Sequence, residues 1–475
     1  MIGYVLAPLV SSASILVRVP PAGTDIEPVR ARMLPAIVPL ALTAVAISAW
    51  FVVDVFAVSA SFGDSSVELG AYVAFGTIAH VPFFLLQATS VAIVPALAAT
   101  VDAGLLGAPV RRVLVISNNA ETPEAQPGPQ AQPGFAELAR RFDAVVSWNE
   151  IVHPFHPTDW RPRAADATLW ERLLRQAWNL GDGPLELVLE SIQAPPALAL
   201  AGLFLDAPIR LYSDGLMTYG PSRRTLGDQI GTRLAQVLYL ELIAGLRPLV
   251  AREYGPAGTA IPSAAFTSVL AEVSAATPPT DDLPSGCALI VGQYLSAAEL
   301  ISEDQERALY VDMVRRAVAL GHRELVFKPH PTAPRHWQQH LAAAAAAEGA
   351  RLSFVGTACL AEVLYERLRP AVVIGCFSTA LLTASAFYGL PVAQVGTALL
   401  SERLTPFANS NRVPVALVDA LVPSLAAGQA PRRVTTEAVG GIEGVSRLVA
   451  TLAYCMQPTT CDDLRGIAVD ELRTN

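Results

Sequence analysis

The sequence has almost no lysine: Lys328 is the only one, and the other basic residues among its 33 are all arginine. A net charge of −9 without a basic run argues against a general nucleic-acid binder. The five cysteines form no Cys-x-x-Cys pair and no His/Cys cluster with zinc spacing, which indicates reduced thiols and no metal site. Gly-x-Gly-x-x-Gly and phosphate-loop lysine patterns are also absent, which disfavours a dehydrogenase or a P-loop enzyme.

Apolar residues make up 52% of the chain, and their excess is concentrated in residues 1–108. Leu34–Phe62 carries one charge, Asp54, and Ala71–Val101 carries only a histidine. Both segments exceed the roughly 20 residues that cross a bilayer, although a pair of buried alanine-rich helices remains an alternative. The positive-inside rule predicts a cytoplasmic region after residue 108, because the flanking arginines are Arg18, Arg30, Arg32, Arg111 and Arg112.

From Arg111 the pattern changes to short apolar strands that alternate with helices such as 167–178, 195–205 and 379–388. A polar, proline-rich stretch at 274–286 indicates a hinge, after which the alternation restarts. Two successive doubly wound halves predict an α/β fold of two Rossmann-like domains facing a cleft. The predicted strands are 113–116, 144–146, 185–189 and 209–212 before the hinge, and 287–291, 324–327, 351–354, 371–374 and 392–394 after it.

Polar residues follow several of these strands, at the carboxyl ends where open α/β sheets bind ligands. Asp214 and Gly215 follow strand 209–212, Lys328 and His330 end strand 324–327, and Ser378-Thr379 follow strand 371–374. Each has an ordinary explanation as a turn, a structural histidine or a helix cap, and their joint placement favours a site. Weaker candidates are Asn118, Asn119, Arg223, Gly292 and Gln293.

The order Asp-Gly, His-Pro, Ser-Thr resembles the motifs of bacterial sialyltransferases, and a longer match resembles the α-2,8-polysialyltransferase-like family. It covers about residues 111–455 and rests on Glu190-Ser191-Ile192-Gln193 and on 206–221, which contains Asp-Gly-Leu-Met. Ser213 departs from a position that is often acidic in related enzymes, so the linkage does not carry over. The N-terminal stretch, with Val52-Val53-Asp54-Val55, resembles a fragment of a polysaccharide flippase.

This resemblance implies a GT-B glycosyltransferase that transfers sialic acid from a CMP-activated donor to a glycan or glycolipid acceptor. The reaction would be inverting and metal-independent, without a cofactor, at the cell membrane. Asp214 would be the general base, and His330 a donor or acid at the leaving phosphate. Donor-binding residues would be Gly215, Lys328, Pro331, Ser378, Thr379, Gly292 and Gln293, and acceptor or sugar contacts Asn118, Asn119 and Arg223.

The expected division is a membrane anchor at 1–108, an acceptor domain at 109–280, a donor domain at 281–435 and a helical tail at 436–475.

A Lys-Pro-His-Pro run also occurs in CDP-glycerol glycerophosphotransferases and in capsule transferases that use other CMP-sugars such as CMP-Kdo, and these remain alternatives. A different class, an inactive flippase-derived membrane scaffold, would be indicated if Asp214, His330 and Ser378 did not converge.

Overall fold

The structure is a computed structural model that describes residues 94–474, apart from 108–110, 121–122, 124–127, 191, 214, 280–281, 294, 331–335 and 357–358. The chain divides into two units, residues 1–80 and 81–475, and all of the first unit lies outside the described residues. Asp214, Pro331 and the predicted membrane segments, except residues 94–101, also lie outside them. No helix within the described ranges is both long and apolar enough to cross a bilayer.

The first lobe contains two parallel sheets instead of the single doubly wound half predicted from the sequence. One joins β1 (Val113–Ile116) to β2 (Ala144–Ser147), as expected from the two predicted strands. The other has four strands in sequential order, β3 (Leu187–Leu189), β4 (Ile209–Ser213), β5 (Leu234–Leu240) and β6 (Ala257–Ile261). The strands β5 and β6 were not predicted from the sequence, because each run has few β-branched residues to separate a strand from a helix.

Helices and the four-stranded sheet of this lobe enclose a second hydrophobic core, which contains the completely buried Trp148. The Trp148 ring meets Trp160 edge-on with centroids 5.5 Å apart and lies 6.4 Å from Trp178. The helices are α5 (Phe135–Ala139), α6 (Trp148–Val152), α7 (Ala167–Ala177), α8 (Ala197–Leu203) and α9 (Asp228–Gly231). The predicted helices at 167–178 and 195–205 are therefore confirmed with slightly shorter bounds.

The second lobe has a five-stranded parallel sheet in the order β11-β10-β7-β8-β9. Every predicted strand of this half is confirmed within one residue. All four residues of β7 and of β10 are buried, as expected for parallel strands covered on both faces. The strands are β7 (Ala288–Val291), β8 (Glu324–Lys328), β9 (Arg351–Phe354), β10 (Val372–Gly375) and β11 (Val392–Gln394).

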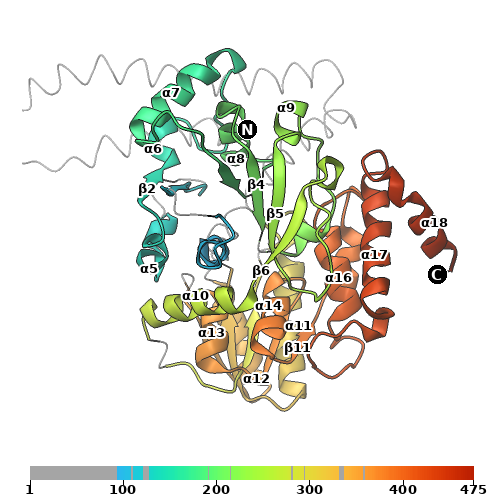
Figure 1. The fold of residues 1–475 in the computed structure, drawn as a ribbon. Helices are drawn as coiled ribbons and strands as arrows, with labels where there is room; N and C mark the ends of the chain where they lie inside the picture. The colour runs from blue at the N-terminus through green and yellow to red at the C-terminus, as the bar shows by residue number, and fades with distance from the viewer. Residues whose placement is uncertain are drawn as a thin grey trace, which may run out of the picture. The chain divides into compact units, whose positions relative to one another are not determined.

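In this order β7 is the central strand. The chain adds β8 and β9 on one side of β7, and after β9 it crosses back to add β10 and β11 on the other side. Right-handed crossovers then put α11 (Glu303–Ala319) and α12 (Trp337–Ala347) on one face. They put α13 (Ala361–Leu368) and α14 (Thr379–Tyr388) on the other face, with α10 (Ser263–Ala276) packed beside α13 (Figure 1). Open α/β sheets bind ligands at such a reversal. The crevice here means this position of the fold, outside the carboxyl ends of β7, β8 and β10.

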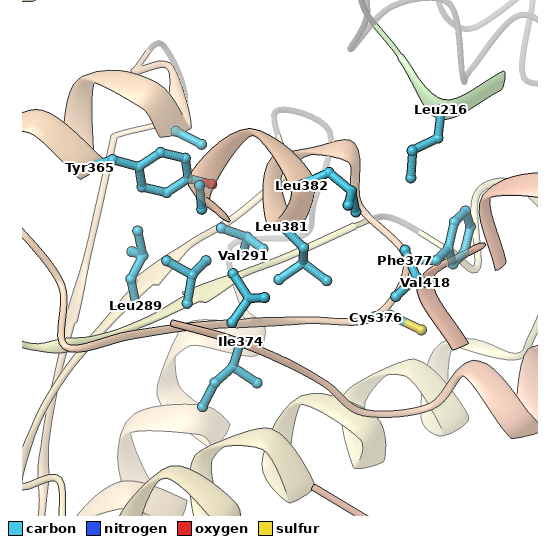
Figure 2. Packing of buried hydrophobic residues seen from close by; sticks show 14 of the residues in the cluster. Leu216, Leu289, Val291, Tyr365, Ile374, Cys376, Phe377, Leu381, Leu382 and Val418 are labelled. Atoms are coloured by element: carbon cyan, nitrogen blue, oxygen red, sulfur yellow. The ribbon is translucent and has the colours of Figure 1, made fainter. Parts of the chain in front are cut away.

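Apolar packing fixes α14 on this sheet. Leu381 is completely buried and lies over the β7 and β10 side chains Val291 and Ile374 (Figure 2). The predicted helix 379–388 is confirmed with the same bounds. Because Leu381 and Leu382 anchor its first turn, the amino end of α14 is held directly above the carboxyl end of β10.

The C-terminal helices join the two lobes. They are α15 (Thr397–Arg403), α16 (Arg412–Leu421), α17 (Gly441–Met456) and α18 (Arg465–Thr474). Asp463, before α18, pairs with Arg252 of the first lobe at 2.6 Å. The side-chain amide of Gln457 donates to the Arg223 carbonyl oxygen at 3.1 Å, so the tail is anchored beside the loop that follows β4.

Residues 94–102 are helical, and five of their apolar side chains belong to the main hydrophobic core: Val94, Ala96, Leu97, Ala98 and Ala99. Asp102 at the end of this helix pairs with Arg141 at 2.6 Å, and Arg141 also pairs with Glu272 of α10 at 2.8 Å. The Leu105 carbonyl accepts a hydrogen bond from Arg210 of β4 at 2.6 Å. The end of the predicted segment Ala71–Val101 is thus packed as part of the α/β unit.

Candidate functional site

The loops after β7 and β8 meet at the centre of the crevice. The Gly292 amide donates to the Lys328 carbonyl oxygen at 2.9 Å, which extends the pairing of β7 with β8 by one step. A Cβ at Gly292 would lie 2.9 Å from Cζ of Phe327 and 3.2 Å from the Lys328 carbonyl oxygen. Only glycine allows this close approach, so the two loops are held side by side at the sheet edge.

Lys328 and His330 lie partly buried at the end of β8. Burial lowers the pKa of Lys328, while Cys359 and Glu362 oppose that shift. Within the described part of the chain, the Lys328 ammonium forms no ion pair within 4.0 Å. A cation at the carboxyl end of a parallel strand that forms no close ion pair within the described ranges is suited to an anionic ligand.

Burial, together with the charge of Lys328, lowers the pKa of His330 to about 4. The imidazole is therefore neutral at physiological pH, and a neutral imidazole carries one N–H donor and one acceptor nitrogen. The sequence left open whether His330 acts as a donor or as an acid, and this environment favours the neutral donor.

Ser378 and Thr379 begin α14 at the end of β10, as the sequence predicted. The Ser378 hydroxyl accepts a hydrogen bond from the Ala380 amide at 3.2 Å and is the N-cap of the helix. Capping uses an oxygen lone pair and leaves the hydroxyl hydrogen for another acceptor. The first turn of the helix adds backbone N–H groups and a partial positive charge, which together suit a phosphate.

The Asp-Gly-Leu-Met stretch forms the short helix η3 (Leu216–Tyr219) directly after β4. Leu216 and Tyr219 are buried, and the Tyr219 hydroxyl donates to the Leu240 carbonyl and accepts from the Leu242 amide, both at 3.1 Å. A Cβ at Gly220 would lie 2.9 Å from Cγ2 of Val413 in α16. The stretch is therefore fixed on both sides, by the end of β5 and by α16.

The loops of the two lobes touch at one defined point. The Leu216 amide donates to the Thr379 hydroxyl oxygen at 3.3 Å, and a Cβ at Gly215 would lie 3.5 Å from the same oxygen. Leu216, Phe377 and Val418 belong to one cluster of buried apolar side chains (Figure 2). The structure thus brings the Gly215 and Ser378-Thr379 motifs together, and residue 214 itself lies outside the described residues.

Asn118 and Asn119 make contacts within the loop after β1. Asn118 accepts from the Ala120 amide at 3.2 Å and donates to the Pro123 carbonyl at 3.0 Å. The Asn119 side-chain oxygen accepts from Ser117 at 2.6 Å. These contacts fit the structural role of a turn that asparagine commonly plays.

Arg223 lies at an exposed turn that the Glu190–Gln193 signature holds in place. Gln193 accepts from the Arg223 amide at 2.9 Å and donates to the Arg224 carbonyl at 2.6 Å. The Arg223 guanidinium lies 3.3 Å from the sulfur of Met217 in η3. This contact places one arginine side chain against the Asp-Gly-Leu-Met stretch.

Two buried residues of α11 with polar groups, Glu306 and Tyr310, were not predicted from the sequence. They contact the loop after β7 through hydrogen bonds. Their signal in the sequence is a carboxylate at a position where the helical period expects an apolar residue, four residues before a tyrosine on the same face. No group of three His, Cys, Asp or Glu side chains in the described ranges could hold a metal ion.

The protein is therefore an α/β protein of two lobes. The loop after β4 of the first lobe contacts the start of α14 in the second lobe, at the carboxyl ends of parallel strands. The sequence pattern of the Alpha-2,8-polysialyltransferase (POLYST) family matches residues 96–397, and the chain belongs to this family. It is therefore a glycosyltransferase, an enzyme that moves a sugar from a donor to an acceptor.

Among solved structures the chain is similar to a mutant O-GlcNAc transferase of Thermobaculum terrenum. The two share 14% identity over 79% of this chain and 74% of that one, with a TM-score of 0.29. No curated protein matches the chain.

Proposed function

We propose that the chain transfers sialic acid, or a related nonulosonic acid, from a CMP-activated donor to a glycan acceptor, with inversion and without a metal ion. The observation that carries this proposal is the hydrogen bond from Leu216 to Thr379, which joins the Asp-Gly loop to the Ser-Thr helix start at 3.3 Å. The two lobes would then work as a GT-B pair, with the membrane nearby supplying the acceptor.

In the proposed reaction, Asp214 removes the proton of the acceptor hydroxyl as its oxygen attacks the anomeric carbon. The bond from that carbon to the CMP oxygen breaks, and CMP leaves with the electron pair. Negative charge develops on the phosphate, and three kinds of donor would stabilise it. They are the neutral His330 N–H, the Lys328 ammonium, and the Ser378 hydroxyl with the amino end of α14.

Donor profiling tests the proposal directly. The full chain is incubated with an acceptor glycan and CMP-sialic acid, CMP-Kdo or CDP-glycerol, with and without a metal chelator, and nucleotide release is measured. We expect turnover with CMP-sialic acid that the chelator does not change. Turnover with CDP-glycerol or CMP-Kdo alone would assign the chain to the alternative donor class, and no turnover with any donor would favour the inactive scaffold.

Asp214→Asn tests the assigned base. Loss of general-base catalysis should lower kcat by about 10²–10⁴-fold and leave the affinity for CMP unchanged. Asp228→Asn, at an exposed position of the same lobe, is the matched control and should keep full turnover. An Asp214→Asn protein with full turnover would remove the assignment.

A further inference from the structure

A buried hydrogen-bond chain runs behind the crevice from α11 to the loops after β7 and β10. Its first member, Glu306, is completely buried. The carboxylate accepts from the Leu295 amide at 2.8 Å, and from the Ser296 amide and hydroxyl at 2.7 Å each. It also accepts from the Tyr310 hydroxyl at 2.7 Å. These donors offset the cost of removing a carboxylate from water, a cost that raises the pKa of Glu306.

Tyr310 carries the chain to Gln293. Its ring is packed edge-on against Phe327 with centroids 5.1 Å apart, which fixes the position of the hydroxyl. The hydroxyl oxygen accepts from the Gln293 amide at 2.6 Å and also contacts the Gln293 carbonyl oxygen. The backbone of Gln293, at the carboxyl end of the central strand, is therefore bound from behind by one tyrosine side chain.

Gln293 carries the chain to the Ser-Thr loop. Its side-chain oxygen accepts from the Phe377 amide at 2.9 Å, one residue before Ser378. Because a backbone N–H can only donate, the oxygen end of the Gln293 side chain must face Phe377. Its NH₂ end donates no hydrogen bond to any of the residues that the structure describes, and Gln293 is only partly buried.

We propose that the Gln293 NH₂ group donates to an acceptor oxygen of the donor nucleotide, and that Tyr310 and Glu306 are positioning residues that hold Gln293 in this orientation. The inference rests on the proposed function, since it takes the nucleotide to be that of a CMP-sugar. It explains why an ionisable group lies within an otherwise apolar helix–sheet interface, where a leucine would fill the space at lower cost. The Gln293 side chain also fixes the distance between the loops after β7 and β10, because it belongs to the first loop and bonds to the Phe377 amide of the second.

The test measures the Kd of CMP for the full chain and the KM for the donor. Tyr310→Phe should weaken CMP binding by about fivefold to tenfold, with a smaller change in kcat, because positioning of the nucleotide is lost and the base is not touched. Gln293→Glu keeps an oxygen for the Phe377 amide and replaces the donor group with a charged acceptor, so it should weaken CMP binding by about tenfold or more. Tyr254→Phe removes a hydroxyl that donates to the Leu226 carbonyl in the other lobe and should change neither constant.

A double-mutant cycle separates positioning from general loss of packing. If Tyr310 acts through Gln293, Tyr310→Phe should have no further effect on CMP affinity in the Gln293→Ala background. Equal weakening in both backgrounds, or a Gln293→Glu protein that binds CMP as tightly as wild type, would overturn the inference. If Tyr310→Phe fails to fold, Gln293→Glu still decides. A wild-type chain that neither binds CMP nor turns over a CMP-sugar would instead overturn the proposed function.

Discussion

Burial determines the chemistry of single residues in this crevice, most clearly at the end of β8. His330 would titrate near neutral pH in water, but its surroundings and the neighbouring Lys328 charge lower its pKa to about 4. The same enclosure leaves Lys328 with a lowered pKa and without an ion pair among the described residues. In the proposed reaction the pair offers one positive charge and one neutral donor, and it offers no acid.

The depressed pKa of His330 predicts a stability difference that depends on pH. The unfolded imidazole binds a proton below about pH 6.5 and the folded one only below about pH 4, so acid favours the unfolded state between these values. Relative to His330→Asn, wild type should therefore lose roughly 2 to 3 kcal/mol between pH 7.5 and pH 4.5. Urea unfolding at both pH values measures the difference.

Exposed His340 of α12 provides the matched control, since His340→Asn makes the same substitution at a solvent-exposed position of the same lobe. Lys328→Met should raise the pKa of His330 and shrink the acid effect, since a repelling charge is removed. A wild-type to His330→Asn difference that stays constant with pH would contradict the depressed pKa.

Residues at strand ends could be predicted from the sequence, whereas Glu306 and Tyr310 of α11, which contact the loop after β7, could not. The placement of Ser378, Thr379, Lys328 and His330 after β10 and β8 could be predicted, because the carboxyl ends of parallel strands meet at one edge of the sheet. The contact of Leu216 with Thr379 joins residues 163 positions apart, and the local pattern of apolar residues cannot predict a contact at that separation.

At the scale of elements, the serine N-caps of α11 and α14 can be compared directly, because both helices follow strands of the same five-stranded sheet. Ser302 caps α11 by accepting from the Gln305 amide at 3.2 Å, and Ser378 caps α14 by accepting from the Ala380 amide at 3.2 Å. Replacing either serine by alanine should cost about 1 kcal/mol of stability, because both leave a helix amide without its partner.

Only Ser378→Ala should affect catalysis. It should lower kcat/KM for the donor by about tenfold, since a donor to the phosphate is lost in addition to the cap. Ser302→Ala should keep kcat/KM near wild type. Thermal melting and initial rates of both variants check the pair, and equal rates for both would argue against Ser378 as a phosphate contact.

The strands were predicted better in the second lobe than in the first for a physical reason. Strands buried on both faces consist of continuous apolar residues, as Cys287–Val291 and Ala371–Ile374 do, and this pattern is easy to recognise between helices. In the first lobe, β5 is rich in leucine and β6 contains glycine and alanine, so neither pattern is distinctive. The sequential order of β3 to β6 depends on tertiary pairing, which the local sequence does not encode.

At the scale of the whole molecule, the α/β unit begins before residue 109. The helix at 94–102 contributes five buried apolar side chains and ends in Asp102, which pairs with Arg141. We therefore predict that a chain starting at residue 109 melts well below one starting at residue 81. The lost burial corresponds to on the order of 5 kcal/mol.

Thermal melting and size-exclusion chromatography of the two chains measure this difference. Asp102→Asn in the longer chain is the control for the ion pair alone, and it should cost far less because the pair is partly exposed. Equal melting temperatures for the two chains would show that the helix is dispensable.

The single lysine makes the protein suitable for labelling at one defined side chain. Lys328 carries the one side-chain primary amine in all 475 residues, and it is the partly buried last residue of β8. Reagents that acylate amines can therefore modify this chain only at Lys328 and at its amino terminus. A lowered pKa also leaves more of this amine unprotonated, and hence nucleophilic, than at an ordinary lysine. An isotope label or a fluorophore could thus be attached at the crevice of the unaltered protein, without removing competing lysines first.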